Sequence, residues 1–149
     1  MKKIAVSACL VGKNTKYNGK NNYNENVINY LKDKEYILIC PEVTGGLPTP
    51  RQPSEIIKDK VINKKNEDVT FNFITGANKT IKLLLSENVD TVILKSNSPS
   101  CGYGKIYDGT FLGNLIDGNG VFAELALKHN IKIYTEKDIE NMIKKVTNI

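Results

Sequence analysis

Four short apolar runs along the chain, each bounded by turn-forming residues, predict β-strands. They are rich in isoleucine and valine and lack a strict alternation of apolar and polar residues. This pattern is typical of strands that are buried on both faces of a parallel sheet. The predicted strands are Ile4–Ala8, Tyr36–Ile39, Thr91–Leu94 and Ile131–Tyr134.

Apolar residues at helical spacing predict helices between and after these strands. The predicted helices are Glu25–Lys34, Asn72–Asn88, Gly120–His129 and Glu136–Lys145. A loop with three prolines, "GGLPTPRQP", breaks this rhythm, and "EIIKDKVIN" after it predicts a small hairpin that turns at Lys58–Lys60. We therefore expect one α/β domain over residues 1–149, a three-layer sandwich with a mainly parallel, Rossmann-like sheet and a small hairpin insertion.

Length and composition are those of a globular domain, with 149 residues, 40% hydrophobic and 25% charged. No apolar run approaches the roughly 20 residues that cross a bilayer, and the short run after the first lysines is interpreted as a strand, not an export signal. The net charge is +5, but the lysines are scattered along the chain. We expect a cytoplasmic protein with neither a membrane nor a nucleic acid as its partner.

Arg51 is the single arginine in this lysine-rich chain. A guanidinium offers a planar fork of donors that lysine lacks, which suits bidentate recognition of a carboxylate, a phosphate or a substrate edge. A structural salt bridge to a loop carboxylate is the alternative interpretation.

The three cysteines, Cys9, Cys40 and Cys101, each lie at or just beyond the end of a predicted strand. Because the carboxyl ends of parallel strands meet at one edge of the sheet, where ligands bind, we expect the three thiols on the same side of the molecule.

Several kinds of chemistry suit such a group of thiols. Their odd number argues against a disulfide framework. Catalytic zinc uses three protein ligands and one open position, and Cys101 alone could be a nucleophile, although the only histidine, His129, is expected at a helix end. Three thiolates could also bind an iron–sulfur cluster with one iron left open. Unrelated structural cysteines are the remaining possibility.

Longer motifs around the cysteines add a family resemblance. The stretches "SACLVG", "CPEVTGGLPTPRQPSEI", "DVT" followed by "GA", "LKSNSPSCGYGKIYDGTF" and "GNGV" occur in this order over nearly the whole chain. Together they resemble the thiouracil desulfidase family. The resemblance implies a [4Fe-4S] cluster bound by Cys9, Cys40 and Cys101, with one iron lacking a protein ligand. It also implies a small thiolated base or nucleoside as substrate, whose sulfur is replaced by water without net redox change and is released as hydrosulfide.

The resemblance also implies roles for neighbouring residues. Glu42 would be the general acid–base group, and Ser98 would lie beside the substrate, with Ser100 as the second choice. Arg51 and the Gly45–Gly46 pair would frame the pocket.

Asp68 would orient either a loop or the substrate, and the segment "GYGKIYDGTF" could fold over the site as a lid.

The chain departs from the family in its first loop. Many members have C-R-Y-D-G there, where this sequence has "TKYNG", with Thr15 and Lys16. This difference leaves the identity of the thiolated substrate open, and the motifs do not indicate the oligomeric state. Two rival functions remain: a zinc-dependent hydrolase on the same thiols, and a non-catalytic module that binds nucleotides or tRNA.

Overall fold

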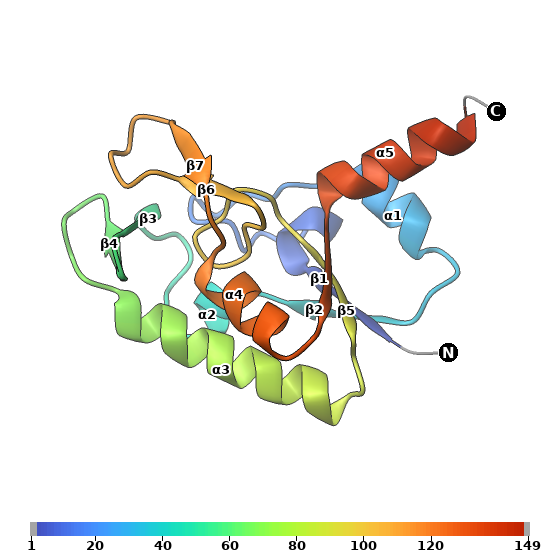
Figure 1. The fold of residues 1–149 in the computed structure, drawn as a ribbon, viewed down its shortest axis with the longest axis horizontal. Helices are drawn as coiled ribbons and strands as arrows, with labels where there is room; N and C mark the ends of the chain where they lie inside the picture. Colours follow the sequence, from blue (N-terminus) through green and yellow to red (C-terminus); the bar gives the residue numbers. More distant parts are fainter. Residues whose placement is uncertain (1–2, 148–149) are drawn as a thin grey trace.

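The fold is built on a four-stranded sheet in which every strand pair is parallel. The computed structural model describes residues 3–147. Its main sheet has the order β2-β1-β5-β8 and consists of β1 (Ile4–Ser7), β2 (Tyr36–Ile39), β5 (Thr91–Leu94) and β8 (Lys132–Thr135) (Figure 1). The four predicted strands are confirmed, two of them to the residue and two with ends shifted by one residue.

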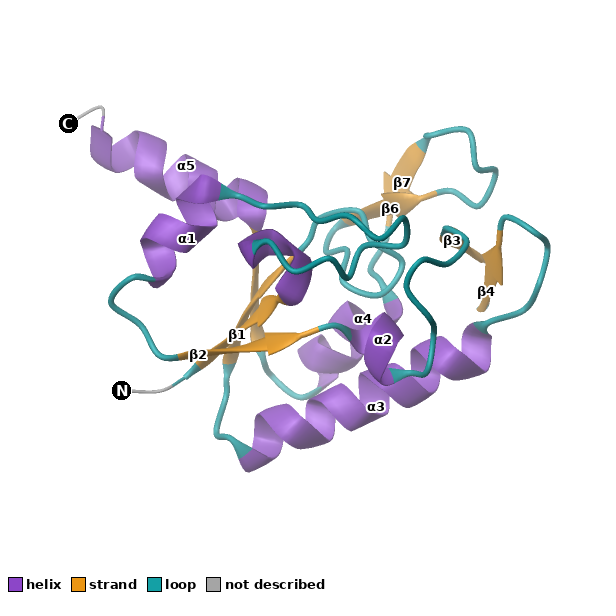
Figure 2. Cartoon of the chain, turned by 180° about the vertical axis from the view of Figure 1, so that it is seen from behind, coloured by secondary structure: helices purple, strands orange, loops and turns teal. Residues whose placement is uncertain are grey.

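Helices cover both faces of this sheet and complete a three-layer sandwich (Figure 2). On one face lie α1 (Glu25–Leu31) and α5 (Glu136–Thr147), and on the other lie α3 (Thr70–Ser86) and α4 (Val121–Lys128). All four predicted helices are confirmed, with ends that differ by at most three residues. Every helix among the described residues is too short or too polar to cross a lipid bilayer.

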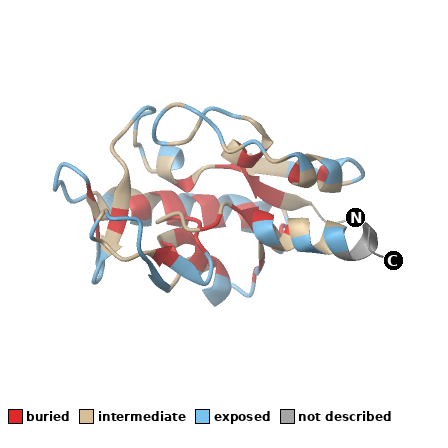
Figure 3. Cartoon of the chain, turned by 90° about the horizontal axis from the view of Figure 1, so that it is seen from above, coloured by how far each residue is buried: buried red, intermediate tan, exposed pale blue. Residues whose placement is uncertain are grey.

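Neighbouring residues of each central strand face opposite layers of the sandwich. Ala5 and Val92 belong to the core beneath α3 and α4, whereas Val6 and Ile93 belong to the core beneath α1 and α5. All four are fully buried, and the buried positions run through the centre of the molecule between the helices (Figure 3). Burial on both faces explains why these strands are continuously apolar.

Two antiparallel hairpins lie beyond the carboxyl end of the sheet (Figure 1). The first, with strands β3 (Ser54–Ile57) and β4 (Lys60–Asn63), confirms the predicted hairpin insertion. The second, with strands β6 (Lys105–Tyr107) and β7 (Leu115–Asp117), was expected only as a lid-like segment. Its strands have three residues each, and β7 is exposed throughout, so no alternation of apolar and polar residues marks them.

Two one-turn elements that the sequence pattern did not predict begin directly where strands end. They are the 3-10 helix η1 (Ala8–Val11) after β1 and the helix α2 (Pro41–Thr44) after β2. Cys9 lies in η1, and Cys40 is the residue that precedes the first turn of α2. Both thiols are therefore presented at the carboxyl edge of the sheet.

Candidate functional site

A cavity of about 450 Å³ opens where β1, β2 and β5 end. The chain leaves β1 toward β2 on one side, whereas β5 lies on the other side of β1. The cavity therefore lies at a topological switch point, the place where open α/β sheets bind their ligands. Cys9, Cys40 and Cys101 are free thiols, and all three line this cavity.

Cys9 is held by the first loop. The side-chain amide of Asn22 donates to the Cys9 sulfur at 3.4 Å, and the Asn22 backbone N–H donates to the Cys9 carbonyl at 3.0 Å. Burial raises the pKa of the Cys9 thiol, and the hydrogen bond from Asn22 opposes this rise. The loop therefore orients the sulfur and supplies a donor that stabilises its thiolate form.

Cys40 depends on close packing between α2 and α3. A Cβ atom added to Gly45 would overlap the carbonyl oxygen of Asn72, and one added to Gly76 would overlap the carbonyl oxygen of Pro41. The two glycines thus allow the helix backbones to touch, which places the amino end of α2, and Cys40 with it, at the cavity.

Cys101 lies in a loop that Ser98 folds into a turn. The Ser98 hydroxyl oxygen accepts the backbone N–H of Ser100 at 3.1 Å and that of Cys101 at 3.0 Å. The Ser98 carbonyl accepts the N–H of Gly102 at 2.8 Å. Gly120, at the start of α4, lies so close to the Ser100 backbone that a side chain there would clash with it. The loop is therefore fixed both by its own serine and by α4.

The Cys101 thiol is strongly biased toward its neutral form. Burial raises its pKa to about 12, and the neighbouring Cys40 and Glu42 add to the rise, although hydrogen bonds from Ser7 and Ser100 oppose it. A thiolate at this position needs a positive partner, and a metal centre supplies one.

The donor set of this cavity fits an iron–sulfur cluster. Cysteine thiolates are the usual ligands of such clusters. A single Zn²⁺ requires ligand sulfurs roughly 4 Å apart, and among residues 3–147 no three His, Cys, Asp or Glu side chains are placed to hold one metal ion. A four-iron cluster is larger than a single zinc ion, so the sulfurs that would bind it lie farther apart. Cys9, Cys40 and Cys101, which border one cavity, are the residues that would hold it.

Glu42 is fixed beside these thiols by two partners. Its Oε1 accepts from Arg51 Nε at 3.2 Å, and its Oε2 accepts from the Ser100 hydroxyl at 2.9 Å. The Glu42 and Arg51 side chains are only 15% and 7% exposed. Since both carboxylate oxygens accept, the arrangement is that of an ionised carboxylate with a defined orientation. It is a potential proton acceptor at the cavity wall.

Arg51 lines the cavity, but its donors are directed at the protein. Besides Glu42, it donates to the carbonyl of Pro48, the hydroxyl of Thr49 and the carbonyl of Thr15, at 3.2, 3.0 and 2.9 Å. The loop salt bridge, weighed as an alternative from the sequence, is the contact present. Arg51 therefore positions Glu42 and ties the first loop to the proline-rich loop.

Comparison with known proteins places the chain in a family. The family model described as 2-thiouracil desulfurase matches residues 4–138. The chain belongs to the 2-thiouracil desulfurase family. The chain is also similar to the "Uncharacterized protein YbbK" of Bacillus subtilis (strain 168), with 38% identity over 150 residues, covering 94% of this chain and 99% of that protein.

A solved structure extends this similarity to three dimensions. The structure of the [4Fe-4S]-dependent thiouracil desulfidase TudS has a TM-score of 0.89 and is 35% identical, and the match covers 100% of both chains. The resemblance inferred from the sequence motifs is confirmed, and the α/β sandwich is the fold of that desulfidase.

Three residues expected from the family resemblance to bind substrate do not line the cavity. Gly45 packs against α3, and its carbonyl accepts from the Asn72 side chain at 2.9 Å, while Gly46 follows it away from the cavity. Asp68 accepts the backbone N–H of Thr70 at 2.9 Å, at the first turn of α3. Gly45 serves helix packing, Gly46 has a positive φ of +92°, and Asp68 forms a turn just before α3, so substrate contact by these residues remains a prediction.

The first-loop residues in which the chain departs from the family pattern do line the cavity. Thr15 and Lys16 both border it, next to Tyr17. The departure therefore falls at this cavity and not on a remote surface.

A buried carboxylate of the first hairpin holds the second hairpin over the cavity. Glu55 Oε1 accepts the backbone N–H groups of Gly109 and Phe111 at 2.9 and 3.1 Å, and Glu55, Phe111 and Tyr107 line the cavity. Sequence reasoning missed Glu55. Its signal was an acidic residue in the apolar strand "SEII", a position that is only 8% exposed.

A second network that sequence reasoning missed joins the loop after β5 to α5. Buried Glu136 accepts from the backbone and hydroxyl of Ser96 at 2.7 and 2.8 Å and pairs with Lys95 Nζ at 3.2 Å. Lys95 and Ser96 both line the cavity near Cys9. This network anchors the start of the loop that ends at Cys101.

Proposed function

We propose that this protein is a [4Fe-4S]-dependent enzyme that removes sulfur from thiolated pyrimidines. The reaction replaces the C=S group of thiouracil by C=O, with water as the oxygen source and hydrosulfide and a proton as the other products, so no electrons are exchanged. The observation that supports it most directly is the meeting of Cys9, Cys40 and Cys101 at one cavity in a chain of the 2-thiouracil desulfurase family. A reducing cytoplasm would keep these thiols free.

The proposed cluster has three cysteine ligands and one iron without a protein ligand. When bound, it supplies a Lewis-acidic iron to which a soft thiocarbonyl sulfur can coordinate. The described residues that line the cavity include Cys9, Cys40 and Cys101 but no fourth cysteine, and no histidine, which is consistent with an open position.

General acid–base catalysis is assigned to Glu42, together with Ser98 and Ser100. Glu42 accepts the proton of the attacking water, because its carboxylate is held at the cavity wall by Arg51 and Ser100. Ser98 and Ser100 hydroxyl oxygens are 3.0 Å apart, so a chain of hydrogen bonds leads from Ser98 through Ser100 to Glu42. This chain can return the proton toward the ring or the departing sulfur.

The second hairpin is assigned the role of shielding the site. Phe111 and Tyr107 present aromatic side chains to the cavity, and Glu55 fixes the connecting loop in place. Exclusion of bulk water would restrict the attack to the water next to Glu42 and protect the cluster from oxidants.

The test is sulfide release by protein reconstituted with iron and sulfide under strictly anaerobic conditions. We expect the visible absorption of an iron–sulfur cluster, and equal amounts of hydrosulfide and uracil from thiouracil. Cys101→Ala should lose the cluster and the activity together. Failure of the cluster-loaded protein to release sulfide from any thiolated base or nucleoside would refute the proposal. Turnover by colourless protein with one zinc per chain would favour the hydrolase instead.

A further inference from the structure

One polar side chain that lines the cavity has no hydrogen-bond partner among the described residues. In the loop after β5, the polar side chains on either side of Asn97 are all engaged by other protein groups. They are Lys95, Ser96, Ser98 and Ser100. The Asn97 side chain lines the cavity, yet among the described residues neither its amide oxygen nor its amide nitrogen forms a hydrogen bond with protein.

The backbone of Asn97 is held in a conformation that asparagine tolerates well. Its φ angle is +67°, and it forms a β-bridge with Ile106 of the second hairpin. Most side chains are strained in this left-handed region, but asparagine is enriched there. The loop therefore fixes the backbone from which the Asn97 side chain projects.

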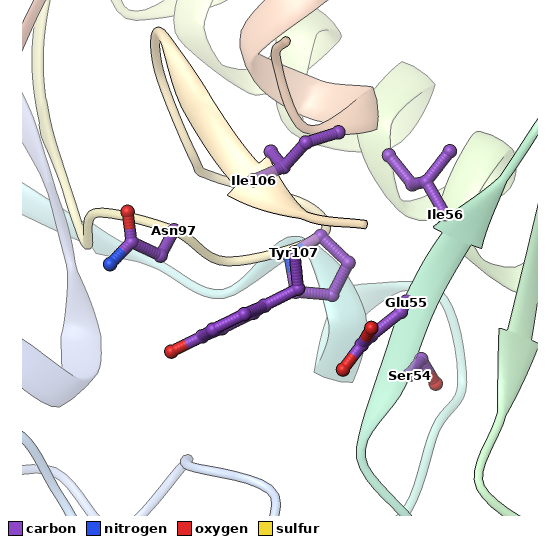
Figure 4. Close-up of a pocket in the computed structure, with 7 residues that line it drawn as sticks. Ser54, Glu55, Ile56, Asn97, Ile106 and Tyr107 are labelled. Carbon is purple, nitrogen blue, oxygen red and sulfur yellow. The ribbon is translucent and has the colours of Figure 1, made fainter. Parts of the chain in front are cut away.

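Figure 4 shows the neighbours of this side chain around a recess. The amide of Asn97 projects from its loop on the side away from Glu55, and the ring of Tyr107 lies between the two residues. Asn97, Tyr107 and Glu55 border both this recess and the larger cavity that contains the three cysteines. A ligand in the larger cavity can therefore contact both the thiols and this wall.

A primary amide matches one edge of a uracil ring. The Asn97 oxygen can accept one hydrogen bond while its NH₂ group donates another. Thiouracil keeps N3–H beside an unmodified carbonyl, whichever of the two flanking carbons holds the sulfur, and this pair is the complement of an amide. The serine hydroxyls of the loop are less suitable, since Ser100 already donates its proton to Glu42 and Ser98 is hydrogen-bonded to Ser100.

We propose that Asn97 is the residue that recognises the pyrimidine. Its amide oxygen accepts from N3–H, and its amide nitrogen donates to the adjacent ring carbonyl. Asn97 then fixes the rotation of the ring. The thiocarbonyl sulfur is directed at the cysteines, and the ring carbon that bears it faces the attacking water proposed beside Glu42. This inference rests on the proposed function, which supplies the thiolated pyrimidine.

The experiment compares uracil with 3-methyluracil, whose methyl group removes the N3–H donor. Binding to the anaerobic, cluster-loaded enzyme is measured by calorimetry for the original protein and for Asn97→Gly, since glycine keeps the positive φ without strain. The matched control is Asn130→Gly, another positive-φ asparagine (φ +59°), which is exposed and does not line the cavity. Asn97→Asp is the second variant, which retains an acceptor but no donor. Cluster absorbance per chain is recorded for each protein.

We expect the original enzyme and Asn130→Gly to bind uracil about tenfold or more tightly than 3-methyluracil, the scale of one or two lost hydrogen bonds. In Asn97→Gly this ratio should fall to near one at unchanged cluster absorbance. Asn97→Asp keeps the acceptor for N3–H and should retain the preference, but it should bind uracil more weakly because it lacks the donor to the ring carbonyl. An unchanged ratio in Asn97→Gly, or no preference in the original enzyme, overturns the assignment of Asn97. Sulfide release by the original enzyme is measured in parallel. If the enzyme releases sulfide but the binding ratio is unchanged in Asn97→Gly, only the assignment of Asn97 is rejected. If the ratio is lost in Asn97→Gly but the original enzyme releases no sulfide, only the desulfidase function is rejected.

Discussion

The hydroxyl of Ser100 donates to Oε2 of Glu42 at 2.9 Å and so links the loop of one cysteine to the helix that follows another. Cys101 comes directly after Ser100, and Cys40 lies two residues before Glu42. A proton acceptor is therefore positioned by the same two segments that present two of the thiols. Any change at this link is expected to affect proton transfer more than the binding of a cluster.

Replacement of Glu42 by glutamine should separate these two properties. Glutamine keeps the size of the side chain and can still accept from Ser100, but it cannot take up a proton. We expect kcat to fall by about 10²–10⁴-fold, while the visible absorption of the cluster is retained. Glu35→Gln, at an exposed position, is the control and should leave both unchanged. Full activity in Glu42→Gln would show that another group accepts the proton.

The high pKa of Cys101 predicts how the stability of the cluster-free protein varies with pH. The folded protein keeps the Cys101 proton up to about pH 12, whereas the unfolded chain releases it near the ordinary value of 9.0. Between these values the unfolded state binds fewer protons, so the free energy of unfolding falls as the pH rises.

Urea denaturation at a series of pH values would measure this effect. Cys101→Ser removes the titrating thiol and keeps a side chain of similar size, so its free energy of unfolding should fall less steeply with pH above about pH 9. Parallel curves for the two proteins would contradict the assigned burial of the thiol.

Glu55 should control the mobility of the second hairpin. Glu55→Ala removes the acceptor of the Gly109 and Phe111 N–H groups, so we expect faster hydrogen exchange at these two amides and faster bleaching of the cluster in air. Glu124→Ala, which removes an exposed hydrogen bond to Asn119, is the matched control. Unchanged exchange at Gly109 and Phe111 would mean that other contacts hold the loop.

Gly76 offers a test of the packing that places Cys40. In a helix interior, alanine is normally more stable than glycine by roughly 0.5–1 kcal/mol. At Gly76 the added methyl group would overlap the carbonyl of Pro41, so we expect a loss of about 1–3 kcal/mol in the free energy of unfolding and a lower cluster content. Asn78→Ala, at an exposed position of the same helix, should be neutral or stabilising.

Much of the fold could be predicted because burial leaves a local trace in the sequence. The run Thr91–Leu94 is apolar because both faces of β5 are covered, and the spacing of Phe73, Ala77 and Ile81 follows the single buried face of α3. The short elements α2 and η1 leave no such trace, since one turn is too short for a periodicity. The hairpin of β6 and β7 left no such trace either, because its strands have only three residues each and β7 is exposed throughout.

The sequence by itself determined which residues end the strands, and so it determined that Cys9, Cys40 and Cys101 would meet at one edge of a parallel sheet. It also contained the motifs of the family. Only the tertiary structure decided the partners: that Arg51 pairs with Glu42, that Gly45 and Asp68 lie against α3, and that Glu55 holds the second hairpin. It also decided that the Asn97 side chain lines the cavity without a partner in the part of the chain that the structure describes. Strand ends follow from local patterns of burial. Hydrogen-bond partners follow from how distant segments pack, which no local pattern records.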